Sequence, residues 1–178
     1  ERARLTELLV EYLEKKGELT EAMNLLQDLR LEILTTMDEK ERIGLMLHQF
    51  RLCLQCNDQL RASLCAEKIH DQHLKDDDLR LQFLELLITY HTSFTHNYME
   101  IAKSHYDVFK INGNSESLMN AILFAVMAPH SPEQLQFCKD LHELKDLALL
   151  PEARMLLTIF MGHDLVAWPE FEQRFSSI

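Results

Sequence analysis

The sequence predicts an all-α fold, arranged as a right-handed α-solenoid of antiparallel helix pairs. Only four Gly and four Pro occur among 178 residues, and no proline precedes Pro129, so the residues that most often interrupt helices are scarce. Apolar residues recur at spacings of three and four through most of the chain, as in amphipathic helices. Small residues beside the expected turns recur every forty residues, which is typical of a repeat protein.

The first expected helix pair occupies about residues 1–36. The apolar residues of its first helix follow helical spacing: Leu5, Leu8, Leu9, Tyr12 and Leu13. Lys15, Lys16 and Gly17 supply a cationic last turn and a C-terminal glycine that end this helix. Thr20 is expected to cap the second helix. The inner face of that helix carries Ala22, Leu25, Leu26, Leu29 and Ile33.

Two further pairs are expected at about residues 37–74 and 75–112. Asp38 or Thr36 can start the third helix, and a polar turn at residues 56–58 separates it from the fourth. Polar signals also precede the fifth and sixth helices and follow the sixth. These signals are Asp76–Asp78, Thr95–Asn97 and Asn112–Asn114.

Residues 115–178 predict a less regular set of helices. The segment Leu118–Ala128 is apolar nearly all round, which is typical of a buried helix, and Pro129 stops it. Another helix is expected to start at Ser131–Gln134. This segment has a serine cap, a proline in the first turn and a glutamine three residues after the cap. Pro151 begins a further helix, and Trp168-Pro169 interrupts a last short segment.

A period of forty residues connects the first three pairs. Gly17, Asn57 and Asn97 stand at the expected turns, and an alanine follows each turn residue five positions later. These alanines are Ala22, Ala62 and Ala102. A small residue beside a turn lets the second helix pack closely on the first, so the three alanines are the predicted helix-packing residues. The pattern is tetratricopeptide-like, although its period is longer than that family's; an accidental period in a helical bundle is the alternative.

The length of the chain fits a single α-solenoid domain over residues 1–178. Stacked helix pairs share a continuous core and leave a concave surface and two ends for partners. Glu1 stands in a charged helical context without an initiator Met or a signal-peptide pattern. We therefore expect the sequence to be a piece of a longer protein.

Charge and cysteine content restrict the possible partners and compartments. The 18 Lys and Arg against 29 Asp and Glu give a net charge of −11, which would repel nucleic acid and anionic membrane surfaces. We expect neither as a partner, and no stretch resembles a membrane span. The four cysteines lie on helical, mostly apolar patterns, which indicates reduced thiols in a cytosolic or nuclear protein and no disulfide.

Catalytic and metal sites are not expected. Cys53 and Cys56, followed by His70 and His73, superficially resemble a two-Cys, two-His zinc site. A helix over residues 57–70 would, however, place His70 roughly 20 Å from the turn that holds Cys56. The acidic run Asp76–Asp78 is explained by helix capping. No Gly-rich phosphate loop, metalloprotease helix or Ser-His-Asp arrangement occurs locally, so we expect no cofactor and no enzyme. A metal-binding or catalytic helical protein is the competing class.

Five strings stand out in order along the chain: Glu1–Thr6, Gly17–Ala22, Leu26–Leu29, Glu39–Arg42 and Arg51–Leu54. In this order and spacing they resemble the PCI family, in particular its subunits in the proteasome regulatory particle lid. Three later segments are similar more in pattern than in letters: Tyr98–Phe109, Ala121–Pro129 and Leu150–Trp168. The resemblance covers most of the chain and is specific mainly over Glu1–Ile69.

The resemblance implies an α-solenoid arm that leads toward a PCI module, whose winged helix is not recognisable in this sequence. It also implies a non-catalytic scaffold in the cytoplasm and nucleus that supports lid assembly and ubiquitin-dependent protein degradation. The implied partners are other lid subunits, including the deubiquitinating one, together with the ATPase ring and the core particle. A COP9 signalosome subunit or another PCI-family scaffold has the same architecture and is the alternative.

Overall fold

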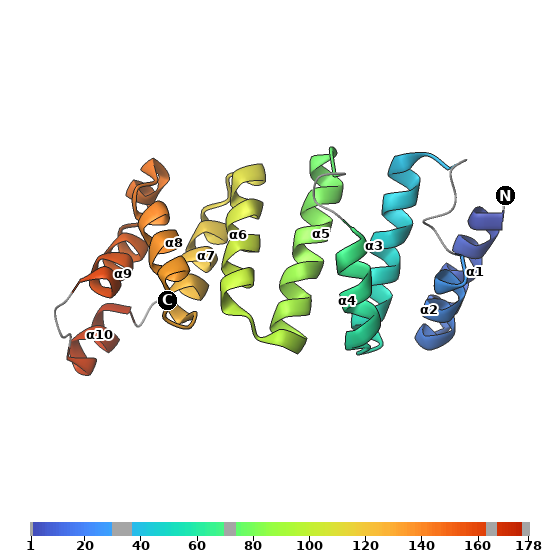
Figure 1. Ribbon diagram of the computed structural model, residues 1–178, viewed down its shortest axis with the longest axis horizontal. Helices are drawn as coiled ribbons and strands as arrows, with labels where there is room; N and C mark the ends of the chain where they lie inside the picture. The colour runs from blue at the N-terminus through green and yellow to red at the C-terminus, as the bar shows by residue number, and fades with distance from the viewer. Residues whose placement is uncertain (1, 30–36, 70–73, 163–166, 176–178) are drawn as a thin grey trace. The chain divides into compact units, whose positions relative to one another are not determined.

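The computed structural model describes residues 2–29, 37–69, 74–162 and 167–175. These residues form α-helices with short connections and contain no strand (Figure 1), which confirms the all-α prediction. The chain divides into two compact units, Glu1–Thr95 and His96–Ile178, each with its own hydrophobic core. The single-domain organisation and the repeat bounds expected from the sequence stay predictions.

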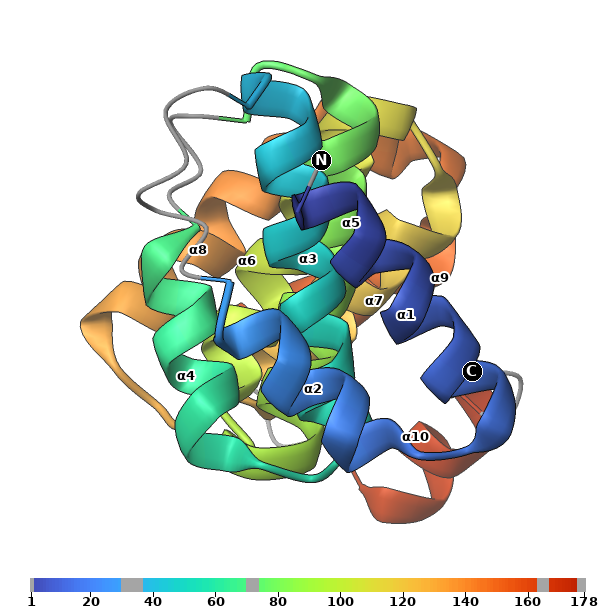
Figure 2. The same ribbon diagram turned by 90° about the vertical axis from the view of Figure 1, so that its right-hand side faces the viewer.

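The first unit is built from two helix pairs and a fifth helix. Its elements are α1 (Arg2–Lys16), α2 (Leu19–Gln27), α3 (Glu39–Gln55), α4 (Gln59–Lys68), α5 (Asp77–Tyr90) and the π-helical turn η3 (His91–Thr95). Helix α1 packs on α2 and α3 packs on α4, as the pairing pattern predicts, and α3 also contacts α2 and α5. Viewed from the end, α1, α3 and α5 form one layer, and α2 and α4 form the other (Figure 2).

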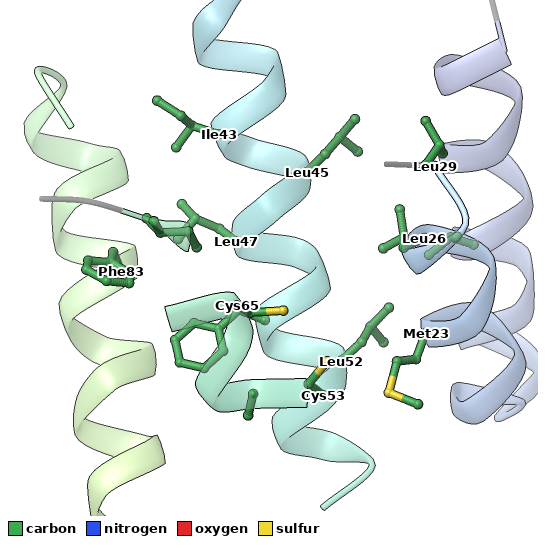
Figure 3. Close-up of a cluster of buried hydrophobic side chains, with 14 of the residues drawn as sticks. Met23, Leu26, Leu29, Ile43, Leu45, Leu47, Leu52, Cys53, Cys65 and Phe83 are labelled. Atoms are coloured by element: carbon green, nitrogen blue, oxygen red, sulfur yellow. The ribbon is translucent and has the colours of Figure 1, made fainter. Parts of the chain in front are cut away.

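Helix α3 lies at the centre of the first unit's core. Its side chains Leu45 and Leu52 point toward α2, and Phe83 of α5 lies on the opposite side of α3 (Figure 3). The ring of Phe50, which is fully buried, lies 6.3 Å from the ring of Phe83 and 6.2 Å from that of Tyr90. Aromatic contacts at such distances and tilted angles are favourable, so this cluster holds α5 against α3.

The second unit is centred on α7. Its elements are α6 (Tyr98–Asn112), α7 (Ser115–Met127), α8 (Pro132–His142), the 3₁₀ turn η4 (Lys145–Leu149), α9 (Pro151–Met161) and α10 (Trp168–Phe175). Helix α7 contacts α6, α8 and α9. Its buried residues include Leu118 and Ile122, whereas Met127 at its end is exposed. The apolar character of this segment therefore reflects a central helix, as predicted.

Most helix boundaries follow the expected capping signals. Gly113 ends α6 in the left-handed conformation, with φ +66, where a residue without a Cβ is favoured. Asn97, Asn114 and Ser131 accept hydrogen bonds from backbone N–H groups at the starts of α6, α7 and α8. Pro129 follows the end of α7, so short polar side chains and proline set these limits.

One expectation about a helix boundary differs from the structure. Helix α2 begins at Leu19, after Glu18, without a side-chain cap. Thr20 therefore lies inside the first turn, and its predicted capping role is wrong. Helix α5 belongs to the first unit and α6 opens the second, and their pairing as a repeat stays a prediction. Ile33 and Thr36 lie outside the described residues.

Candidate functional site

The three predicted helix-packing alanines are all fully buried. Ala22, Ala62 and Ala102 each have 0% exposure. Ala22 and Ala62 belong to the core of the first unit, and Ala102 to the core of the second, with Leu118 and Ile122 of α7. Burial is what a close helix contact requires; their equivalence as packing residues stays a prediction.

The turns before these alanines keep a common backbone conformation but not a constant spacing. Gly17, Asn57 and His96 have positive φ values of 83, 58 and 50. The third left-handed residue is therefore His96, one position before Asn97, and Ala102 follows it by six residues instead of five. Ile101 follows His96 by five and is also fully buried. Sequence spacing identified the turns but could not resolve this shift of one residue.

Helix α1 presents an apolar stripe to solvent. Its members are Leu5, Leu8, Leu9 and Tyr12, with exposures of 68%, 63%, 47% and 58%. The sequence pattern identified these residues as the apolar side of the helix, but the side that packs on the unit carries Ala3 and Val10. Contiguous exposed apolar patches are uncommon on monomeric proteins and typically mark protein-interaction sites.

A groove of about 500 Å³ runs between α3 and α5. Each helix contributes four residues at helical spacing: Gly44, Leu47, His48 and Arg51 from α3, and Gln82, Glu85, Leu86 and Thr89 from α5. Gly44 also lines a second hollow, of about 260 Å³, with Ala3 and Glu7 of α1. This groove was not predicted from the sequence; Gly44, a glycine inside a helical pattern, is the signal that could have indicated it.

Polar contacts join the two helix pairs of the first unit in both layers. Arg51 of α3 donates to Glu14 of α1 over 2.9 and 3.2 Å, and His48 Nε2 lies 3.1 Å from the same carboxylate. In the other layer, Arg61 Nη1 of α4 donates to Asn24 Oδ1 of α2 over 2.7 Å. These contacts connect α1 to α3, and α2 to α4.

The acidic run before α5 serves as a helix cap. Asp76 Oδ1 accepts the backbone N–H groups of Asp78 and Leu79 at 3.1 and 3.4 Å, as the capping hypothesis predicts. Its other oxygen accepts a 2.5 Å hydrogen bond from the Lys40 ammonium. The Lys40 hydrogen bond is the main cause that lowers the pKa of Asp76, and Asp76 in turn raises the pKa of Lys40.

The cysteines sit in environments that suit core residues. Cys53, Cys65 and Cys138 are buried, whereas Cys56 is half-buried. Hydrogen bonding to Cys65, together with burial, raises the pKa of Cys53, and burial raises the pKa of Cys138 to about 11. Thiols that stay protonated are poor nucleophiles and metal ligands.

The described residues contain no metal cluster, and His105 and Asp107 have separate partners. No group of three or more His, Cys, Asp or Glu in the described ranges could hold a metal ion; His70 and His73 lie outside them. His105 stacks on Phe124 at 5.6 Å, and burial lowers its pKa. Asp107 pairs instead with Lys110 at 2.9 Å. Of the helices described, none is long and apolar enough to cross a membrane.

Gln134 is a structural residue whose side-chain contacts the sequence did not predict. Its backbone N–H donates to Ser131 Oγ over 3.1 Å, as expected of a capped helix start. Its side-chain Nε2 donates over 2.9 Å to the carbonyl oxygens of both Ala125 and Ala128 at the end of α7. Only 1% of Gln134 is exposed, so this amide joins the end of α7 to the start of α8 inside the core.

Comparison with known families gives a match over much of the chain. Residues 1–116 match the family model described as PSMD12/CSN4, N-terminal. The matched range covers all of α1 to α6 and therefore includes the apolar stripe, the groove and the three alanines.

Similar proteins are named as proteasome subunits. The chain is 30% identical over 183 residues to the 26S proteasome non-ATPase regulatory subunit 12 of Dictyostelium discoideum, with 96% of this chain and 40% of the relative covered. It is 30% identical over 201 residues to homolog A of that subunit in Arabidopsis thaliana, covering 94% and 45%. The 26S proteasome regulatory subunit RPN5 of Saccharomyces cerevisiae is 23% identical over 188 residues, covering 100% and 42%. The chain thus spans less than half the length of these curated relatives.

Proposed function

The chain belongs to the PSMD12/CSN4 N-terminal family, and we propose that it is part of a non-catalytic scaffold subunit of the proteasome regulatory particle lid. The observation that carries this proposal is the agreement between the family match over residues 1–116 and relatives named as 26S proteasome regulatory subunits. In this role the chain supports lid assembly, and through it ubiquitin-dependent protein degradation, in the cytoplasm and nucleus.

We propose that the chain acts through contacts with other proteins and not through catalysis. The first unit offers an exposed apolar stripe on α1 and an open groove between α3 and α5. Both surfaces suit contact with other polypeptides. The proposed partners are other lid subunits, together with the ATPase ring and the core particle. Residues 115–178 are proposed to lead toward a PCI module.

A second candidate is a scaffold of the COP9 signalosome, because the family description also names CSN4. The relatives described above carry proteasome names, which favours the lid. The two candidates share a scaffold mechanism and differ in their partners.

Affinity purification of the tagged full-length protein, followed by mass spectrometry, tests the proposal. We expect lid subunits to be recovered together with ATPase-ring and core-particle subunits, and the tag alone to recover none of them. Recovery of signalosome subunits in their place would assign the protein to the second candidate. Recovery of neither complex would overturn the scaffold proposal.

A further inference from the structure

The groove between α3 and α5 contains space that the packing of the first unit does not use. Leu47 is buried and Leu86 half-buried along the groove, so it has an apolar floor. Apart from Gly44 itself, its chain neighbours and the backbone of its own helix, no heavy atom lies within 4 Å of the position that a Cβ on Gly44 would occupy. Glycine inside a helix makes the helix less stable than alanine does. Because no neighbouring atom excludes a larger side chain at Gly44, its small size leaves room for a ligand.

The unpaired charge at the rim of the groove is negative. Arg51 is already paired with both oxygens of Glu14, and His48 contacts the same carboxylate. The carboxylate of Glu85 is exposed and forms none of the ion pairs or side-chain hydrogen bonds found among the described residues. The remaining polar groups, on Gln82 and Thr89, are uncharged. Because the charges of Arg51 and Glu14 cancel, Glu85 gives the groove a negative charge. The whole chain is also negative, with a charge of −11.

We propose that this groove binds a lysine or arginine side chain from a basic segment of a partner protein. Such a side chain combines an aliphatic stem with a cationic head. The stem would lie over Gly44, Leu47 and Leu86, and the head would reach Glu85. An acidic segment would meet repulsion from Glu85 without a free cation to balance it. The inference rests on the proposed scaffold role and adds the chemistry of one partner segment.

Titration of the isotope-labelled 178-residue chain with a capped leucine-arginine-leucine tripeptide, followed by NMR, tests this inference. We expect saturable shifts of the amides on α3 and α5 that line the groove, and weaker shifts with a leucine-glutamate-leucine tripeptide. Glu85→Gln should weaken binding of the arginine peptide about two- to fivefold, as expected for loss of one exposed ion pair. Glu67→Gln, on the exposed side of α4, is the matched control and should leave binding unchanged.

Gly44→Leu tests the groove independently of Glu85. The leucine side chain should fill the groove and abolish the peptide-induced shifts, while the helical circular dichroism is retained. The inference is overturned if the arginine peptide causes no saturable shifts, if Glu85→Gln binds it as well as the wild type, or if the acidic peptide binds equally. These results would leave the scaffold proposal intact, because co-purification with proteasome subunits is measured separately. If the chain dimerises at high concentration and the dimer competes with the peptide, the occupant of the groove is a second copy of the chain. That result would overturn the proposal of a different partner protein.

Discussion

Arg51 of α3 donates two hydrogen bonds from Nη2 to the carboxylate of Glu14 on α1, at 2.9 Å to Oε1 and 3.2 Å to Oε2. The two residues are 37 positions apart in the sequence, so this contact joins the first helices of successive pairs. Glu14 is only 21% exposed in its side chain, whereas Arg51 is 48% exposed. Partial burial of the carboxylate makes this pair less screened by water than an ordinary surface ion pair.

A double-mutant cycle with Glu14→Gln and Arg51→Met should therefore give a favourable coupling energy of about 0.5–1 kcal/mol. Urea unfolding of the four proteins measures it. The pair Arg4 and Glu41 is the control, since its atoms are 3.6 Å apart and both side chains are more than half exposed. A coupling for Glu14 and Arg51 no larger than that of the control pair would show that this contact does not hold α1 to α3.

The contact between Lys40 and Asp76 predicts a pH-dependent link between α3 and the start of α5. The pKa of Asp76 is lowered mainly by its hydrogen bond from Lys40. A carboxylate whose pKa is lowered by folding stabilises the protein above its ordinary pKa, near 4, and this contribution is lost as the pH falls through the lowered value. The pKa of Lys40 is raised, so its contribution is complete at neutral pH and is lost only as the pH rises above the ordinary lysine value.

Asp76→Asn and Lys40→Met, combined in a double-mutant cycle at pH 7 and at pH 3, test this link. Asparagine still accepts the capping hydrogen bonds, so the cycle isolates the charge interaction. We expect coupling at pH 7 that decreases at pH 3 and in high salt, measured by urea unfolding. An unchanged coupling across this range would contradict the ionic origin of the contact.

Gln134→Glu tests the amide that joins α7 to α8. The substitution keeps the shape of the side chain but replaces the Nε2 donor, which serves the carbonyls of Ala125 and Ala128, with a second oxygen. Leaving these carbonyls without a donor should destabilise the second unit by about 1–3 kcal/mol. Thermal unfolding at pH 7 and pH 4 provides the measurement, and protonation of the new carboxyl should restore part of the loss.

Gln136→Glu is the matched control for that substitution, because Gln136 is exposed and its amide donates to the exposed Asp140 over 2.8 Å. It should change stability by about 0.5 kcal/mol or less. Equal effects of the two substitutions would mean that the amide of Gln134 is not needed at the end of α7.

The sequence predicts local features of this fold better than contacts between distant residues. Asp76, Asn97 and Ser131 act within three residues of their own position, so capping rules identify them. Glu14 and Arg51 meet only because two helix pairs stack, and nothing in either local pattern indicates the partner. The groove beside Gly44 likewise depends on how α3 and α5 pack, which helical periodicity does not determine.

Ala62 tests the predicted repeat register. It is fully buried in α4, so Ala62→Leu should force strain into the packed core and destabilise the protein by about 1–3 kcal/mol. Glu67→Ala, on the exposed side of the same helix, should change stability by roughly 0.5 kcal/mol or less. Urea unfolding compares them, and equal stabilities would show that Ala62 is not at a tight contact. Ala22→Leu and Ala102→Leu should match Ala62→Leu if the three positions are equivalent.

Leu8 and Val10 distinguish the apolar stripe of α1 from its packed side. Periodicity alone places Leu8 on the apolar side of the helix, yet it is 63% exposed, whereas Val10 is 0% exposed. Leu8→Ala should therefore change the free energy of unfolding by about 0.5 kcal/mol or less. Val10→Ala, which removes less apolar volume, should be the more damaging substitution, at about 1–3 kcal/mol, because it leaves a cavity. Urea unfolding at two protein concentrations measures both effects and separates them from self-association through the stripe. A loss of 2 kcal/mol or more for Leu8→Ala at both concentrations would mean that the stripe is part of the core and that α1 packs with its other side outward.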